Sequence, residues 1–135
     1  RAATAEVETQ VGAFRFAARV LAQGRLFVMF PEGTRSVDGR LQQAQPGAIS
    51  IALRSGAPIL PVGIVGTREA LGVGHGLRRH PVALRVGQPL EFAGLEPKAY
   101  RDKTVIAQVG ERVMSEIAVL RRELRRELGL PPGVE

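Results

Sequence analysis

A run of five apolar residues that ends at a proline constrains the fold of this chain more than any other feature. Residues 26–30 contain no polar side chain, which is typical of a strand buried on both faces of a parallel sheet. Pro31 ends the run, because proline has no N–H group to donate to a central ladder. The sequence therefore predicts a buried strand over residues 26–30.

The polar residues that follow this run form a candidate anion site. Ligands of open α/β sheets bind where the strands end, and the sequence there reads Glu32, Gly33, Thr34, Arg35 and Ser36. Gly33 lets the backbone approach a ligand closely, and Arg35 presents a planar set of donors that matches a phosphate. Thr34 and Ser36 add hydroxyl groups, while Glu32 would hold Arg35 or the loop in place. From the residue types alone, a turn with a local Glu–Arg pair is an equally good interpretation.

Three further segments read as helices. Apolar residues recur at helical spacing over residues 4–23 and over residues 102–128. A shorter helix is predicted over residues 46–54, because Pro46 suits a first helical turn and Gly56 suits a helix end. Residues 66–81, which include His75 and His80, are expected to form a long loop.

Two more strands complete the predicted pattern. Residues 59–65 are mostly apolar, and Pro61 within them indicates a bulge, an edge or an opening of the ladder. Residues 82–86 alternate as in a half-buried strand, with Val82, Leu84 and Val86 on the apolar side. The order of elements predicts an α/β fold with a partly parallel sheet flanked by helices. Three strands are fewer than the roughly five or six of a mean sheet, so more are expected within the loops or upstream of Arg1.

Composition excludes several kinds of site. The 135 residues suffice for one domain or part of one, and the absence of cysteine excludes disulfides, thiolate metal sites and a cysteine nucleophile. No apolar run approaches the roughly 20 residues that cross a bilayer. The net charge of +6 comes almost entirely from arginine and is compatible with membrane phosphate, soluble phosphate or nucleic acid. One tyrosine and no tryptophan leave few rings for stacking bases, so no nucleic acid is expected.

Two segments resemble the glycerolipid acyltransferases, the family of lysophosphatidic acid and glycerol-3-phosphate acyltransferases. Residues 30–36 are similar to its Phe-Pro-Glu-Gly-Thr-Arg-Ser block, and residues 56–67 are similar to a later Gly-x-Pro-Ile/Val-x-Pro-Val strand. The resemblance implies that the acceptor phosphate binds to Glu32, Gly33, Thr34, Arg35 and Ser36, and that the site is shaped by Phe30, Pro31 and Pro61. It also implies transfer of an acyl group from acyl-CoA or acyl carrier protein to the hydroxyl of glycerol 3-phosphate or lysophosphatidate, with no metal or cofactor.

The family's catalytic block, a histidine followed four residues later by an aspartate, has no counterpart in this sequence. His75 and His80 both lack the aspartate and follow the phosphate block instead of preceding it. We therefore expect no catalytic residue within residues 1–135, a single domain portion truncated ahead of Arg1, and no acyl transfer by this chain alone. Gln45 and Pro46 also stand where many relatives carry a lysine before Gly47.

The resemblance implies a peripheral location at the cytoplasmic face of a membrane. The last helix carries four arginines that form either a solvated face with ion pairs or a contact with anionic lipid head groups: Arg121, Arg122, Arg125 and Arg126. The alternative function is a non-catalytic α/β module that binds phosphate or nucleic acid.

Overall fold

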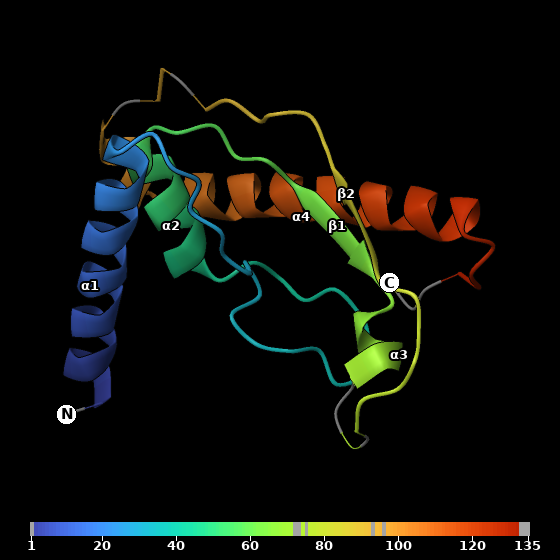
Figure 1. Ribbon diagram of the computed structural model, residues 1–135. Coiled ribbons are helices and arrows are strands. Elements are labelled where there is room, and N and C mark those ends of the chain that lie inside the picture. Colours follow the sequence, from blue (N-terminus) through green and yellow to red (C-terminus); the bar gives the residue numbers. More distant parts are fainter. Residues whose placement is uncertain (1, 72–73, 75, 93, 96, 133–135) are drawn as a thin grey trace.

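The computed structural model describes residues 2–71, 74, 76–92, 94–95 and 97–132 (Figure 1). The elements in this part of the chain, in order, are α1 (Ala2–Ala22), α2 (Pro46–Ser55), β1 (Val62–Val65), α3 (Thr67–Leu71), β2 (Ala83–Val86), the 3-10 helix η1 (Pro97–Arg101) and α4 (Lys103–Glu127). The expected mixture of helices and a sheet is confirmed. None of the helices in these ranges is long and apolar enough to cross a membrane.

The long helix α4 forms the base on which α2, η1 and both strands pack (Figure 1). Asp102 caps its start, because the Asp102 carboxylate accepts hydrogen bonds from the N–H groups of Thr104 at 2.8 Å and Val105 at 3.3 Å. Its buried face consists of Ile106, Val109, Gly110, Val113, Ile117, Leu120 and Leu124. The helical spacing of apolar residues predicted for this segment is confirmed up to Leu124, whereas Leu128 lies beyond the helix and is 44% exposed.

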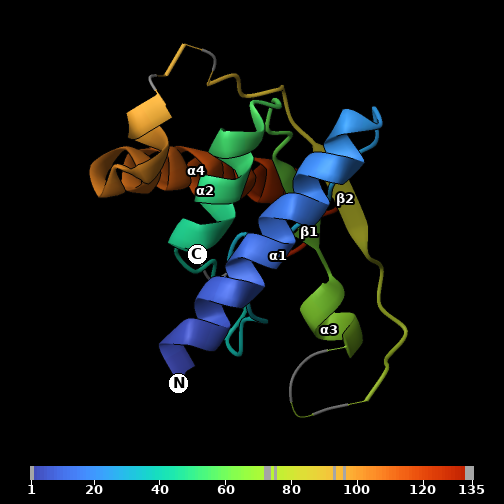
Figure 2. The ribbon, with the colours of Figure 1, turned by 90° about the vertical axis from the view of Figure 1, so that its left-hand side faces the viewer.

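Helix α2 lies between α4 and α1. Its buried residues Ile49 and Leu53 join the core formed with α4. On its other side it contacts α1, where the Arg54 guanidinium lies 4.0 Å from the centre of the Phe14 ring. Figure 2 shows α1 on the outer side of this layer. As predicted, Pro46 begins α2, and Gly56 ends it in a left-handed conformation.

The sheet of the described residues is an antiparallel pair, so the expected parallel pairing is not found there. Val62 pairs with Val86 and Val65 pairs with Ala83. One further bridge joins Ile59 to Leu90. Between this bridge and β1 lies Pro61, which has no N–H to donate, and its carbonyl accepts a hydrogen bond from Gly87 at 2.8 Å. The predicted interruption of the ladder at this proline is therefore present.

The sheet packs on α4 through the side opposite to the one we predicted. Gly63 and Val65 face α4, and a Cβ atom at Gly63 would lie only 2.8 Å from Cβ of Leu120. The bare glycine lets the helix approach on this side. The aliphatic side chains of β2 and its flank therefore face outward, and Val82, Leu84 and Val86 are 52%, 64% and 54% exposed.

The prediction of a buried strand over residues 26–30 is wrong for the described part of the chain. These residues belong to no strand there, and none of their N–H groups donates a hydrogen bond. Phe27 contacts Phe16 of α1 with ring centres 6.0 Å apart. Leu26, Val28 and Phe30 are 79%, 79% and 71% exposed. A run that is apolar on both sides needs cover on both sides, and the described residues cover only one.

Candidate phosphate-binding site

The candidate site is a loop that leads from residues 26–30 to the start of α2. Gly33 donates its N–H to the carbonyl of Phe30 at 3.1 Å, which turns the chain. The N–H of Gln45 then bonds to the carbonyl of Pro31 at 2.8 Å. Gly33 has a φ of +70°, and a Cβ atom there would lie 3.0 Å from Cγ of Gln45. The turn therefore lies directly against the N-terminus of α2, at a position that favours glycine.

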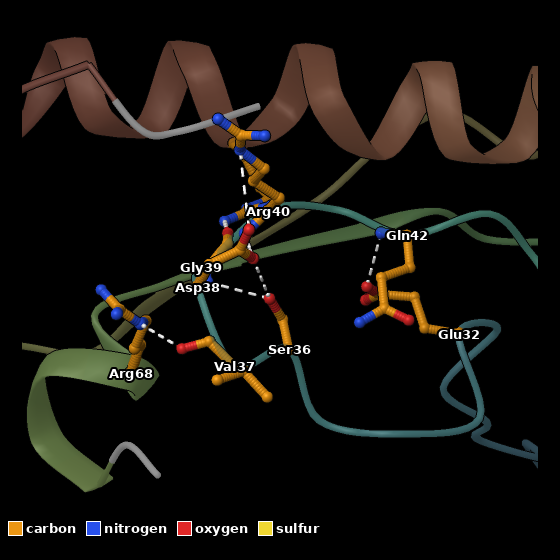
Figure 3. Close-up of polar contacts among 9 residues, drawn as sticks. Glu32, Ser36, Val37, Asp38, Gly39, Arg40, Gln42 and Arg68 are labelled. Carbon is orange, nitrogen blue, oxygen red and sulfur yellow. Dashed lines mark hydrogen bonds and ion pairs between the residues drawn. The ribbon is translucent and has the colours of Figure 1, made fainter. Parts of the chain in front are cut away.

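Glu32 joins the two ends of the loop. Its carboxylate accepts a hydrogen bond from the backbone N–H of Gln42 at 2.8 Å, across ten residues of chain (Figure 3). Arg35 is exposed and makes no hydrogen bond or ion pair within the described residues. The local Glu–Arg pair that the residue types allowed is therefore not formed.

Ser36 and Asp38 build a second turn in the same loop. The Ser36 hydroxyl donates to the Asp38 carboxylate at 3.0 Å and accepts from the N–H of Gly39 at 2.8 Å. Asp38 also accepts a hydrogen bond from the N–H of Arg40 at 3.0 Å. The Arg40 N–H, and after it the Ser36 hydroxyl, lower the pKa of the Asp38 carboxyl below its ordinary 3.8. Because Ser36 gives its only proton to Asp38, it has none left for a phosphate in this arrangement.

Two arginines from other elements fasten this loop to the body of the molecule, and Figure 3 shows the first of them, Arg68. Arg68 of α3 donates through Nε to the carbonyl of Val37 at 3.3 Å. Arg121 of α4 donates to the carbonyl of Gly39 at 3.1 Å. Neither role could be predicted from the sequence, because no local pattern links residues separated by 31 and 82 positions.

The arginines of α4 do not form one uniform face. Arg121 and Arg125 are partly buried against the protein, and Arg125 lies 3.7 Å from the Glu69 carboxylate of α3 and bonds to the carbonyl of Pro131. The partner of Glu123 and Glu127 is Arg85 of β2. These carboxylates raise the pKa of the Arg85 guanidinium. Of the four arginines, only Arg122 and Arg126 are exposed.

The outer side of the loop carries donors that can receive an anion. The N–H groups of residues 34–36 make no hydrogen bond within the described part of the chain, and the side chains of Thr34 and Arg35 are exposed. Nearby, the first turn of α2 contributes the N–H of Gly47, since Pro46 has none and Ala48 and Ile49 donate to the carbonyl of Gln45. Backbone amides, a helix N-terminus and a guanidinium form a suitable donor set for a phosphate.

The remaining predicted residues contribute none of these donors. Phe30 is exposed at the entry to the turn. Pro61 is buried between the Ile59–Leu90 bridge and β1, and no hydrogen bond of the described residues joins it to the loop. His80 lies in the segment before β2, with Nδ1 2.9 Å from the carbonyl of Pro81. His75 and Arg1 fall outside the described residues.

Comparisons with known proteins agree on one family. Residues 5–65 match the family model described as Acyltransferase. The chain is 36% identical over 73 residues to the chloroplastic 1-acyl-sn-glycerol-3-phosphate acyltransferase BAT2 of Brassica napus, a match that covers 53% of this chain and 21% of the relative. It is 44% identical over 71 residues to the 1-acyl-sn-glycerol-3-phosphate acyltransferase of Limnanthes alba, with 52% and 25% covered.

A solved structure shows the same relationship. The crystal structure of the 1-acyl-sn-glycerophosphate acyltransferase PlsC from Thermotoga maritima matches this chain with a TM-score of 0.55 and 32% sequence identity. The match covers 79% of this chain and 46% of that protein. The chain thus spans less than half of this neighbour and about a fifth to a quarter of the two plant relatives.

Proposed function

We propose that this chain supplies the acceptor-phosphate site of a 1-acylglycerol-3-phosphate O-acyltransferase, because residues 5–65 match the acyltransferase family model and 79% of the chain matches the PlsC structure at 32% identity. In this reaction the hydroxyl of a glycerol phosphate or lysophosphatidate acceptor attacks the thioester of acyl-CoA or acyl carrier protein. The acyl group passes to the acceptor oxygen and the thiol leaves. The thioester is already activated, so no metal or further cofactor takes part.

The observation that carries this proposal is the donor set on the outer side of the loop. Arg35 holds the phosphate through charge-assisted hydrogen bonds, assisted by the N–H groups of residues 34–36 and the Thr34 hydroxyl. Glu32 and Ser36 act indirectly, because their hydrogen bonds hold the loop in shape. Gly33 and Pro31 keep the turn against α2. Pro61 donates nothing to the phosphate and affects the site only through the shape of the sheet.

The general base of this reaction comes from another polypeptide segment, since no histidine in the sequence is followed four residues later by aspartate. The exposed side of residues 26–30 is consistent with contact to such an additional segment. Unpaired N–H groups next to exposed Leu26, Val28 and Phe30 are the edge at which a further strand adds to a sheet. We therefore expect no acyl transfer by the 135 residues alone. Because the proposed acceptor is a lipid, we also propose a peripheral location at the cytoplasmic face of a membrane.

Replacement of Arg35 tests the proposed site. Arg35→Ala should weaken the binding of glycerol 3-phosphate by about tenfold or more, since a hydrogen bond to a charged group contributes about 1.5–3 kcal/mol. Titration calorimetry measures this directly and needs no catalytic turnover. Arg112→Ala on the exposed side of α4 is the matched control and should leave binding unchanged.

Two comparisons make the test specific for phosphate. Glycerol, which lacks the phosphate, should bind neither the original chain nor Arg35→Ala. In a complete enzyme, Arg35→Ala should raise KM for the acceptor and leave KM for the acyl donor unchanged. Equal effects on both substrates, or unchanged glycerol 3-phosphate binding, would refute the assignment of Arg35.

A further inference from the structure

A second exposed surface lies at the end of the molecule that carries α3. We define the α3 surface by three aliphatic and two basic residues: Val37, Leu71, Leu77, Arg78 and Arg79. Leu77 is 82% exposed, Val37 is 69% exposed and Leu71 is 54% exposed. The side chains of Arg78 and Arg79 are also exposed. Single exposed leucines are common on proteins, so the exposure of these aliphatic residues gains meaning only from the two arginines at the same end of the molecule.

Hydrogen bonds to α3 join the parts of this surface. Arg68 of α3 bonds to the carbonyl of Val37 at 3.3 Å, which fastens the candidate phosphate loop to one side of the helix. The N–H of Arg78 bonds to the carbonyl of Ala70 at 2.7 Å, which fastens the following loop to α3 as well. Figure 1 shows residues 37–40 and the described residues 76–80 at the same end of the molecule as α3. The aliphatic and basic residues therefore belong to one end of the protein.

The charge of the α3 surface is not neutralised by the acidic residues around it. Glu69 pairs with Arg125 of α4, and Asp38 pairs with Arg40. Within the described residues, Arg78 and Arg79 make no ion pair. Two cations next to exposed leucines thus face outward, and the complementary partner is anionic on its surface and apolar beneath it. A bilayer with anionic lipids has this arrangement, whereas a nucleic acid offers no apolar layer beneath its phosphates to receive the leucines.

We propose that the α3 surface docks on the head-group layer of an anionic bilayer. Leu77 and Leu71 enter the boundary between head groups and acyl chains, and Arg78 and Arg79 bind lipid phosphates. This inference rests on the proposed function, because a lysophosphatidate acceptor lies in such a bilayer. Val37 belongs both to the docking surface and to the candidate loop, so docking brings Arg35 to the level of the lipid phosphates. The arginines of α4 are not needed for this contact.

The chain contains no tryptophan, so one introduced tryptophan can report the contact by its fluorescence. Leu77→Trp should show a blue-shifted emission with vesicles of phosphatidylcholine mixed with phosphatidylglycerol, and brominated acyl chains should quench it. Pure phosphatidylcholine vesicles should have little effect. Leu84→Trp on the outer face of β2, where Leu84 is 64% exposed, is the control and should not respond. A response at residue 84 without one at residue 77 would overturn the proposal.

Charge reversal tests the arginines. Arg78→Glu combined with Arg79→Glu should lower the vesicle partition coefficient by at least tenfold, because each arginine near an anionic surface contributes roughly a factor of five. Arg112→Glu combined with Arg126→Glu changes the net charge equally on exposed positions of α4 and should have a much smaller effect. Equal losses in the two double variants would show a net-charge effect and overturn the assignment of the surface.

Calorimetry with glycerol 3-phosphate separates this proposal from the one on which it rests. The variant at residues 78 and 79 should bind this soluble ligand normally, and Arg35→Ala should still partition onto vesicles. Normal vesicle docking without glycerol 3-phosphate binding would refute only the phosphate site. Normal glycerol 3-phosphate binding without vesicle docking would refute only the α3 surface.

Discussion

Single residues in the candidate loop divide into those that hold it and those that face outward. Glu32 and Ser36 carry polar atoms, but their hydrogen bonds are made inside the loop. Thr34 and Arg35 remain exposed. The sequence predicted which residues belong to the loop, since the chemistry of each is visible in its type. It could not divide them between the two roles, because that division depends on Gln42, Asp38 and Gly39, whose contacts are set by the folded loop.

The lowered pKa of Asp38 predicts how the loop responds to acid. The N–H of Arg40 and the hydroxyl of Ser36 both donate to the Asp38 carboxylate, so the folded loop favours the ionised form of Asp38 over the protonated form. The resulting stabilisation is complete above the unfolded pKa and is lost as the pH falls through the lower folded value. Amide chemical shifts of Gly39 and Arg40 should therefore titrate with a midpoint below the ordinary 3.8.

The matched variant for this titration is Asp38→Asn. It removes the ionisable group but keeps an oxygen acceptor, so the titration of the two amides should disappear while the loop signals persist near neutral pH. A midpoint above 3.8 in the original chain, or an unchanged titration in the variant, would show that Asp38 does not govern the loop.

The helices whose ends are marked by capping or terminating residues could be predicted from the sequence. The elements whose position depends on tertiary packing could not. Helix α2 has Pro46 and Gly56 at its ends, and α4 has the cap Asp102 and a long apolar stripe. Helix α3 has only five residues, too few to show a helical period, so the sequence predicts a loop over residues 66–81 where the structure has this helix. The alternation of β2 was visible, but its buried side depends on the contact between Gly63 and α4, which joins residues far apart in the sequence.

This contact predicts that Gly63→Ala weakens the whole fold. The added Cβ atom would lie 2.8 Å from Cβ of Leu120 and 3.0 Å from the backbone nitrogen of Arg121, so the helix or the strand must shift. We expect a loss of about 1–3 kcal/mol in the free energy of unfolding, as for other overpacked cores. Urea denaturation followed by circular dichroism measures it.

Gly12→Ala is the control for this substitution. Gly12 lies inside α1 with no atom within 4 Å of its added Cβ, so the same change should stabilise the protein by about 0.5–1 kcal/mol through helix propensity. If Gly63→Ala were as stable as the original chain, the packing of β1 on α4 would be looser than this contact indicates. Because Arg121 also holds the carbonyl of Gly39, the shift should move the candidate loop as well.

At the scale of the whole molecule, the described residues bury the apolar faces of α2 and α4 and leave the outer side of the sheet exposed. The core lies between α2 and α4, with Leu90 beside it. The outer side of the sheet and the bare side of residues 26–30 remain exposed, with aliphatic side chains between 43% and 79% accessible at Leu26, Val28, Leu60, Val82, Leu84 and Val86. The sequence predicted that these segments are apolar enough for burial. It could not show that their cover lies outside the described residues.

Bare faces of this kind predict self-association of the chain on its own. Exposed aliphatic surface is removed from water when two copies meet, and unpaired strand edges add hydrogen bonds. Leu84→Thr combined with Val86→Thr should therefore reduce the association measured by sedimentation and the binding of the dye ANS. Stability should be nearly unchanged, because both side chains are more than half exposed.

Val65→Thr on the paired strand β1 is the matched control, because Val65 faces α4 and is only 1% exposed. This substitution replaces one buried methyl group by a hydroxyl that has no hydrogen-bond partner prepared for it. It should lower the free energy of unfolding by about 1–3 kcal/mol. Unchanged association in the variant at residues 84 and 86 would mean that copies meet through residues 26–30 instead. A polypeptide partner that supplies the missing strand should then abolish association and protect the N–H groups of residues 26–30 from hydrogen exchange.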